Sequence, residues 1–145
     1  MIAALASAVH VLALGVGLGA IYARYRALAA PVNVAAVLRA DNFWGLAALM
    51  WIGSGLARAF GGLEKGTAWY LHNNLFQLKM GLYVAAAVLE LWPMYVFILW
   101  RVAEKRGQPI DIRHAPRLRL ISGIEAALVC AMPFVAAAMA RGLSF

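Results

Sequence analysis

Four long apolar stretches divide the chain, at residues 1–23, 42–61, 74–100 and 120–140. Each has about the 20 residues that a helix needs to cross the hydrocarbon core of a bilayer. The connections between them are short and polar, which favours helices that run alternately up and down. The pattern therefore predicts an all-α, integral membrane, antiparallel four-helix bundle that forms a single domain over residues 1–145.

Composition points the same way, because 65% of the residues are hydrophobic and only 13% are charged. A typical soluble domain is about 45–50% apolar and about 25% charged. A small soluble domain buries only about two-thirds of its surface, so it could not cover this much apolar area. The composition excludes a soluble enzyme, a disordered tail and a disulfide scaffold.

The net charge of +7 would indicate nucleic acid in a soluble protein. Here the charges gather between the apolar stretches, so we expect the lipid bilayer as partner and no nucleic acid. The positive-inside rule then places the first and third connections in the cytoplasm and both termini on the outer, periplasmic side of an inner membrane. These connections hold Arg24, Arg26, Arg39, Arg101, Lys105, Arg106, Arg113, Arg117 and Arg119.

Five ionisable residues interrupt the apolar stretches, namely His10, Arg58, Lys79, Glu90 and Glu125. Such residues are costly in hydrocarbon, so they face the interior of a bundle and usually have a function. At 1.5 Å of rise per residue, the imidazole and the two cations fall at one level in the outer half. The sequence predicts a polar pocket there.

Helical spacing relates the polar residues to one another. Lys79, Tyr83 and Glu90 share one helix face, with the carboxylate about 16 Å deeper than the ammonium. Glu125 is expected in the inner half of the last helix. Trp51 lies in mid-span on the same face as Arg58, where a cation–π contact would be favourable. Interfacial belts are the expected positions of Trp44, Trp69, Trp92 and Trp100.

Asp41 precedes the second apolar stretch, where it is expected to cap the start of that helix. The alternative is an ion pair with Arg24 or Arg119. Small residues are expected at helix seams, where they let backbones approach closely. They include Gly15 and Gly19 in the first stretch and Gly45 and Gly55 in the second.

His10 has two interpretations, a hydrogen-bonded core histidine or an axial ligand of haem iron. Neutral imidazole binds iron well, and four-helix bundles hold cofactors between facing helices. A haem with two histidine ligands needs a second one, but His72 and His114 fall in the outer and inner connections. No self-contained catalytic motif is present, so the sequence leaves enzymatic activity undecided.

Several motifs resemble an uncharacterised bacterial family of predicted inner-membrane proteins, domain of unknown function 2214. The resemblance covers nearly the whole chain and implies no activity. Its motifs are residues 41–46 (DNFWGL), 55–60 (GLARAF), 63–66 (LEKG), 69–70 (WY) and 75–80 (LFQLKM).

Residues 7–10 (SAVH) and 78–79 (LK) are more distantly similar to the membrane-bound protoporphyrinogen oxidase family and to the copper resistance protein D group. That resemblance implies b-type haem, with His10 as an axial ligand and Lys79 paired with a tetrapyrrole carboxylate or a redox partner. The oxidase pattern continues with a Trp-rich segment ending in Leu-Pro-Arg. This chain instead has residues 14–19 (LGVGLG) followed by residues 22–24 (YAR), so the oxidase activity is not carried over.

Three functions follow as hypotheses. The first is binding of haem b or another tetrapyrrole for electron transfer or porphyrin handling. His10 would then hold iron, Arg58 and Lys79 would pair with propionates, and Trp51 and Tyr83 would pack on the ring.

The second is a non-enzymatic accessory subunit of a larger membrane complex, or a homodimer, that associates through its glycine stripes. Its internal charges would be structural pairs, such as Lys79 or Arg58 with Glu64. The third is a small transporter or proton relay along Lys79, Glu90 and Glu125.

Overall fold

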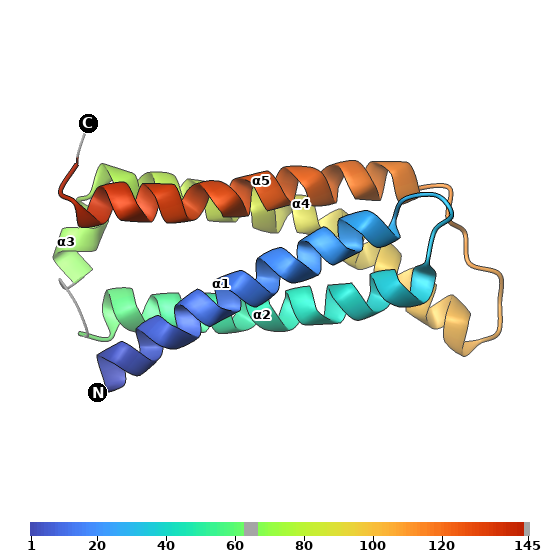
Figure 1. The fold of residues 1–145 in the computed structure, drawn as a ribbon, viewed down its shortest axis with the longest axis horizontal. Helices are drawn as coiled ribbons and strands as arrows, with labels where there is room; N and C mark the ends of the chain where they lie inside the picture. The colour runs from blue at the N-terminus through green and yellow to red at the C-terminus, as the bar shows by residue number, and fades with distance from the viewer. Residues whose placement is uncertain (63–66, 144–145) are drawn as a thin grey trace.

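In the computed structural model the chain forms four long helices and one short one (Figure 1). The structure describes residues 1–62 and 67–143. The long helices are each apolar enough to cross a membrane, and the described residues contain no strand. The predicted all-α four-helix membrane bundle is confirmed. Its helices are α1 (Ile2–Ala27), α2 (Val34–Phe60), α3 (Thr67–Leu71), α4 (Asn74–Lys105) and α5 (Ala115–Ala140).

The long helices run up and down, so their connections fall at two ends of the bundle. Figure 1 shows both chain termini at the end where α3 lies, which we call the terminal end. The α1–α2 and α4–α5 connections lie at the opposite end, which we call the basic end.

The helices extend well beyond the predicted apolar stretches. α1 continues to Ala27 and α4 to Lys105, because Arg and Lys interrupt hydropathy but are good helix formers. α2 begins at Val34, where the side chain of Asn33 accepts a hydrogen bond from the backbone N–H of Ala36 at 3.0 Å. The predicted cap at Asp41 is therefore wrong, since that residue lies well inside α2.

The closest helix packing joins α1 to α2, with further packing of α5 against α1 and α4. Gly17 is buried in the α1–α2 seam, where an added Cβ would lie 3.2 Å from the ring of Trp44. Gly15 and Gly19 face outward, and a Cβ at either would meet open space among the described atoms. The predicted seam glycines of α1 are thus wrong, because the packed face of α1 runs through Ala13, Gly17 and Ile21 instead.

α2 and α4 meet mainly through side chains. The rings of Trp51 and Tyr83 lie edge to face, with centroids 6.4 Å apart. Nearer the basic end, Arg101 of α4 reaches Asp41 of α2 at 2.6 Å. This seam leaves room for cavities between the two helices.

Two of the tryptophans predicted for interfacial belts face the interior of the bundle instead of lipid. Trp44 is buried in a central apolar cluster with Ile21, Trp51, Val129 and Met132. Trp100 is buried in a second cluster at the basic end, and its indole N–H donates to the Asp111 carbonyl at 3.0 Å. The outer surface remains strongly apolar, as expected for contact with lipid. Its exposed side chains include Leu5, Leu12, Val16, Leu49, Val84, Val88, Leu91 and Phe134.

Candidate functional site

A cavity of about 320 Å³ lies at the terminal end of the bundle. Its polar lining comes from His10 of α1, Arg58 of α2 and Lys79 of α4, the three residues predicted to share one level. The structure therefore brings these three groups to the lining of one cavity. Its apolar walls include Trp51, Trp69, Phe76, Met132, Pro133 and Met139.

A second cavity of about 80 Å³ lies between α2 and α4. It shares His10, Trp51 and Lys79 with the larger cavity and adds Tyr83 to the lining. Leu56, which also lines it, is exposed on the outer face of the bundle. The smaller cavity therefore adjoins the surface that faces lipid.

Two polar contacts hold the imidazole of His10. Its Nδ1 lies 3.0 Å from the carbonyl oxygen of Trp51 and 3.0 Å from Oγ of Ser54. A carbonyl oxygen can only accept, so the contact with Trp51 favours a proton on Nδ1, which in a neutral imidazole leaves Nε2 as the nitrogen that can bind a metal. Metal-ligating histidines usually donate their other ring N–H to a carbonyl or carboxylate in this way.

Gly55 gives the imidazole its space. A Cβ at this position would lie 3.1 Å from Cε1 of His10, which is tighter than most real contacts. At Gly53, two residues earlier, an added Cβ would meet no other described atom within 4 Å. Gly55 thus accommodates the histidine ring, whereas the sequence suggested only a role in helix packing.

Trp51 lines both cavities and is only 7% exposed. Its ring centroid lies 5.6 Å from that of His10. Within residues 1–62 and 67–143, its indole N–H has no hydrogen-bond acceptor. A buried indole N–H usually has a partner, so this donor marks a position where a ligand acceptor would be favourable.

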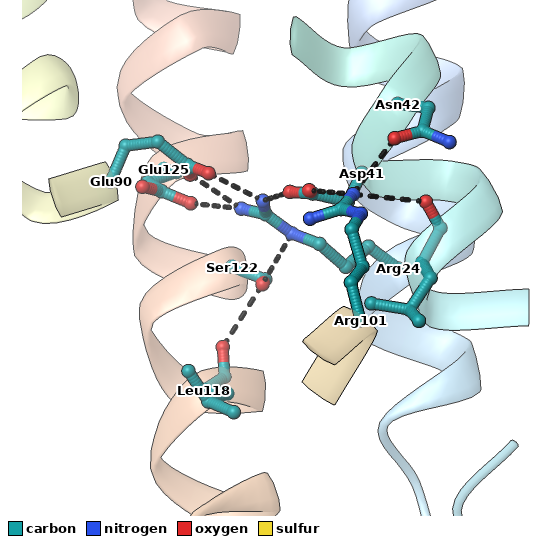
Figure 2. A network of polar contacts seen from close by, with 9 residues as sticks. Arg24, Asp41, Asn42, Glu90, Arg101, Leu118, Ser122 and Glu125 are labelled. Carbon is teal, nitrogen blue, oxygen red and sulfur yellow. Dashed lines mark hydrogen bonds and ion pairs between the residues drawn. The ribbon is translucent and has the colours of Figure 1, made fainter. Parts of the chain in front are cut away.

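A separate network of ion pairs surrounds Arg24, nearer the basic end (Figure 2). Arg24 is fully buried, and each of its five N–H groups has an acceptor. Nε donates to Ser122 Oγ at 3.1 Å, and Nη1 donates to Asp41 Oδ1 at 3.1 Å and to Glu90 Oε1 at 2.8 Å. Nη2 donates to Glu90 Oε2 at 2.8 Å and to Glu125 Oε2 at 2.6 Å. The network thus joins all four long helices.

The network continues toward the surface through Arg101. Its Nη2 donates to Asp41 Oδ2 at 2.6 Å and to Asn42 Oδ1 at 2.8 Å. Its side chain is 30% exposed, whereas that of Glu125 is fully buried. The network therefore has a solvated side and a dry side.

The sequence assigned Arg24 to the first connection and so missed the centre of this network. The ion pair between Arg24 and Asp41, weighed only as the alternative to a cap, is what the structure shows. The sequence did contain one indication of the network. Glu90 and Glu125 lay in apolar stretches, and no cation was predicted at their depth to balance their charge. A flanking arginine was the nearest source of compensating charge.

The central apolar cluster lies between the network and the cavities. Lys79 and Tyr83 line the smaller cavity, and Glu90 contacts Arg24. All three therefore point into the bundle, as expected for residues on one face of α4. Trp51, Val129 and Met132 pack between these levels.

The other two histidines, His72 and His114, do not line the larger cavity. His72 bonds through Nδ1 to the Ala68 carbonyl at 2.8 Å, and His114 packs edge-on against Trp92. The predicted partner Glu64 lies outside the described residues. In the part of the chain that the structure describes, no group of three His, Cys, Asp or Glu residues is arranged to hold a metal ion.

Comparison with known proteins gives a family but no activity. No curated protein and no solved structure matches the chain. The distant similarity to the oxidase and copper resistance groups therefore stays a prediction. A family model described as "Predicted membrane protein (DUF2214)" matches residues 2–144. The chain belongs to this family of predicted membrane proteins.

Proposed function

We propose that this protein binds an anionic, largely apolar ligand in the cavity at the terminal end. The foremost candidate is a tetrapyrrole, haem b, held for electron transfer or porphyrin handling. The observation that carries the proposal is the meeting of His10, Arg58 and Lys79 in one cavity with aromatic walls. A cavity of about 320 Å³ lies at the lower end of the range of about 300–1,000 Å³ for ligand sites.

The residues fit the chemistry of haem. With the proton on Nδ1, which the Trp51 carbonyl would accept, His10 would offer Nε2 to iron. Arg58 and Lys79 supply positive charge for propionates. The thioethers of Met132 and Met139 line the same cavity and are the candidates for a second iron ligand, since Met and His together ligate haem in cytochromes. Bound haem would supply one-electron chemistry.

The cavity residues also suggest how such a ligand would be oriented. The indole N–H of Trp51 would donate to an acceptor on the ligand, and Tyr83 would pack against its apolar part. The smaller cavity adjoins exposed Leu56, so an amphiphile would enter from the lipid between α2 and α4.

We also propose that the basic end faces the cytoplasm of a bacterial inner membrane. The positive-inside rule counts Lys and Arg whether or not they pair with acids, and Arg24 and Arg101 lie toward this end. The exposed cations Arg26, Arg39 and Arg106 remain at this end and support the assignment. Reporter fusions at the C-terminus, active only on one side of the membrane, test it.

The test of ligand binding is an absorption titration of the detergent-purified protein with haem b. A Soret band that shifts and saturates at one haem per chain supports the proposal. The band should be lost in His10→Ala and kept in the matched variant His72→Ala. Equal spectra for all three proteins would contradict it.

A second candidate is an accessory subunit that associates within the membrane. Gly15 and Gly19 favour it, because both face outward on α1 and would let a partner helix approach closely. Such a protein would be colourless and would copurify with a fixed partner or a second copy.

A further inference from the structure

The charges of the Arg24 network do not balance. Its cations are Arg24 and Arg101, and its acids are Asp41, Glu90 and Glu125. Fully ionised, the network would therefore carry one uncompensated negative charge. A buried, uncompensated ion is costly, and such a group takes up a proton instead.

The hydrogen bonds show which acid is in excess. Glu90 faces Arg24 with both oxygens, each 2.8 Å from a different guanidinium nitrogen. Asp41 accepts from Arg24 with one oxygen and from Arg101 with the other. Paired contacts of this kind are typical of ionised carboxylates. These two acids balance the two guanidinium groups.

Glu125 is different, because only its Oε2 contacts Arg24, at 2.6 Å. Its side chain is fully buried, and Oε1 has no hydrogen-bond partner within the two described ranges. Glu125 thus has one oxygen paired with a guanidinium group and one oxygen without a partner, whereas Asp41 and Glu90 each have both oxygens paired, so we assign the excess negative charge to Glu125.

The neighbouring groups on every helix leave this excess in place. On α1, Tyr25 lies beneath the guanidinium of Arg119, at 4.5 Å from Cζ to the ring centroid. Arg119 of α5 also donates to the Tyr25 hydroxyl at 3.2 Å, and within residues 1–62 and 67–143 it forms no ion pair with a carboxylate. Ser122 of α5 is neutral and donates to the Leu118 carbonyl at 2.9 Å. The groups from α2 and α4 are the acids and Arg101 already counted.

We infer that Glu125 is a proton-binding site inside the membrane, which holds a proton on Oε1 while Arg24 is paired with Glu90 and Asp41. The proton would be released when an additional cation reaches the network or when Arg24 pairs with Glu125 more fully. This inference rests on the network alone and does not depend on ligand binding at the terminal end.

Infrared spectroscopy of the detergent-purified protein tests the inference. At neutral pH the wild-type protein should show the C=O band of a protonated carboxylic acid, which shifts in heavy water. The band should be absent from Glu125→Gln. It should persist in Glu104→Gln, which makes the same change at an exposed glutamate near the end of α4.

Stability provides the second measurement. Glu125→Gln keeps the size and the neutral charge of a protonated glutamate, so its Tm should stay within a few degrees of wild type. Glu90→Gln removes an ionised partner of Arg24 and should lower Tm clearly more. Absence of the band from the wild-type protein, its persistence in Glu125→Gln, or failure of Glu125→Gln to fold would each overturn the inference.

Discussion

Arg24 is the residue whose replacement should destabilise the bundle most. Arg24→Met keeps a long side chain on α1 but removes the guanidinium that contacts Asp41, Glu90 and Glu125. Glu90 then loses both of its charged donors in the network. The remaining acids must take up protons or stay buried as ions, and either change costs free energy of folding.

The expected magnitude follows from the burial of the pair. Removing one partner of a buried ion pair costs about 3–5 kcal/mol, because the other charge stays behind uncompensated. At about 3 °C per kcal/mol for a chain of this size, Tm should fall by about 10 °C. Replacing the acids as well should restore stability, since a buried ionic group exchanged as a whole for neutral residues is often tolerated.

Thermal unfolding in detergent, followed by tryptophan fluorescence, measures these changes. Arg26→Met is the matched control, because Arg26 lies one half-turn further along α1, is exposed and contacts only the Tyr22 hydroxyl at 3.3 Å among the contacts described. The triple variant Arg24→Met, Glu90→Gln, Glu125→Gln should recover at least half of the lost Tm. Equal Tm values for Arg24→Met and Arg26→Met would refute the reasoning.

Three further predictions concern the cavity and the helix seam. Gly55→Ala should weaken haem binding in the absorption titration, because its Cβ would meet the imidazole at 3.1 Å, whereas Gly53→Ala should bind as wild type. Lys79→Gln should weaken binding about tenfold or more, since a charged hydrogen bond contributes about 1.5–3 kcal/mol, and an unchanged Kd would contradict a role in ligand binding. Gly17→Ala should lower Tm, because its Cβ would lie 3.2 Å from the ring of Trp44. Gly15→Ala should leave Tm unchanged or raise it, because alanine has the better helix propensity. Equal changes of Tm in the two variants would disprove the seam assigned to α1.

Hydropathy and helical spacing were enough to predict the four helices and the level of the cavity. Both depend on local properties, since span length follows bilayer thickness and depth follows the rise per residue. His10, Arg58 and Lys79 could therefore be placed together without knowing which helices are neighbours. The same arithmetic placed Lys79 and Glu90 on one face of α4, where the structure has them at the cavity and the network.

The network could not be predicted in the same way, because it depends on which helices meet at the basic end. From hydropathy alone, the first apolar stretch ends just before Arg24. In the structure α1 continues to Ala27, and Arg24 is buried between the helices. The seam of α1 was equally hidden. Gly15, Gly17 and Gly19 are identical in local terms, and only the position of Trp44 on α2 selects Gly17.

The network also accounts for how the cavity is assembled at the other end of the bundle. In a bilayer an apolar helix face can contact either another helix or the lipid acyl chains. Apolar faces alone therefore determine poorly how a helix is rotated about its own axis. Arg24 has partners on the other three long helices, so we expect it to set that rotation. His10 lies about four turns from Arg24 along α1, and Lys79 lies about three turns from Glu90 along α4, so each faces inward with its network residue.

Ligand binding should therefore depend on the network from a distance. Arg24→Met should weaken haem binding in protein that is still folded, although Arg24 does not line the cavity. Arg26→Met changes the same type of residue without touching the network and should bind as wild type. A Kd for Arg24→Met equal to that of Arg26→Met, measured below the Tm of both, would show that helix rotation at the terminal end is set by the apolar packing around Trp51 and Met132 instead.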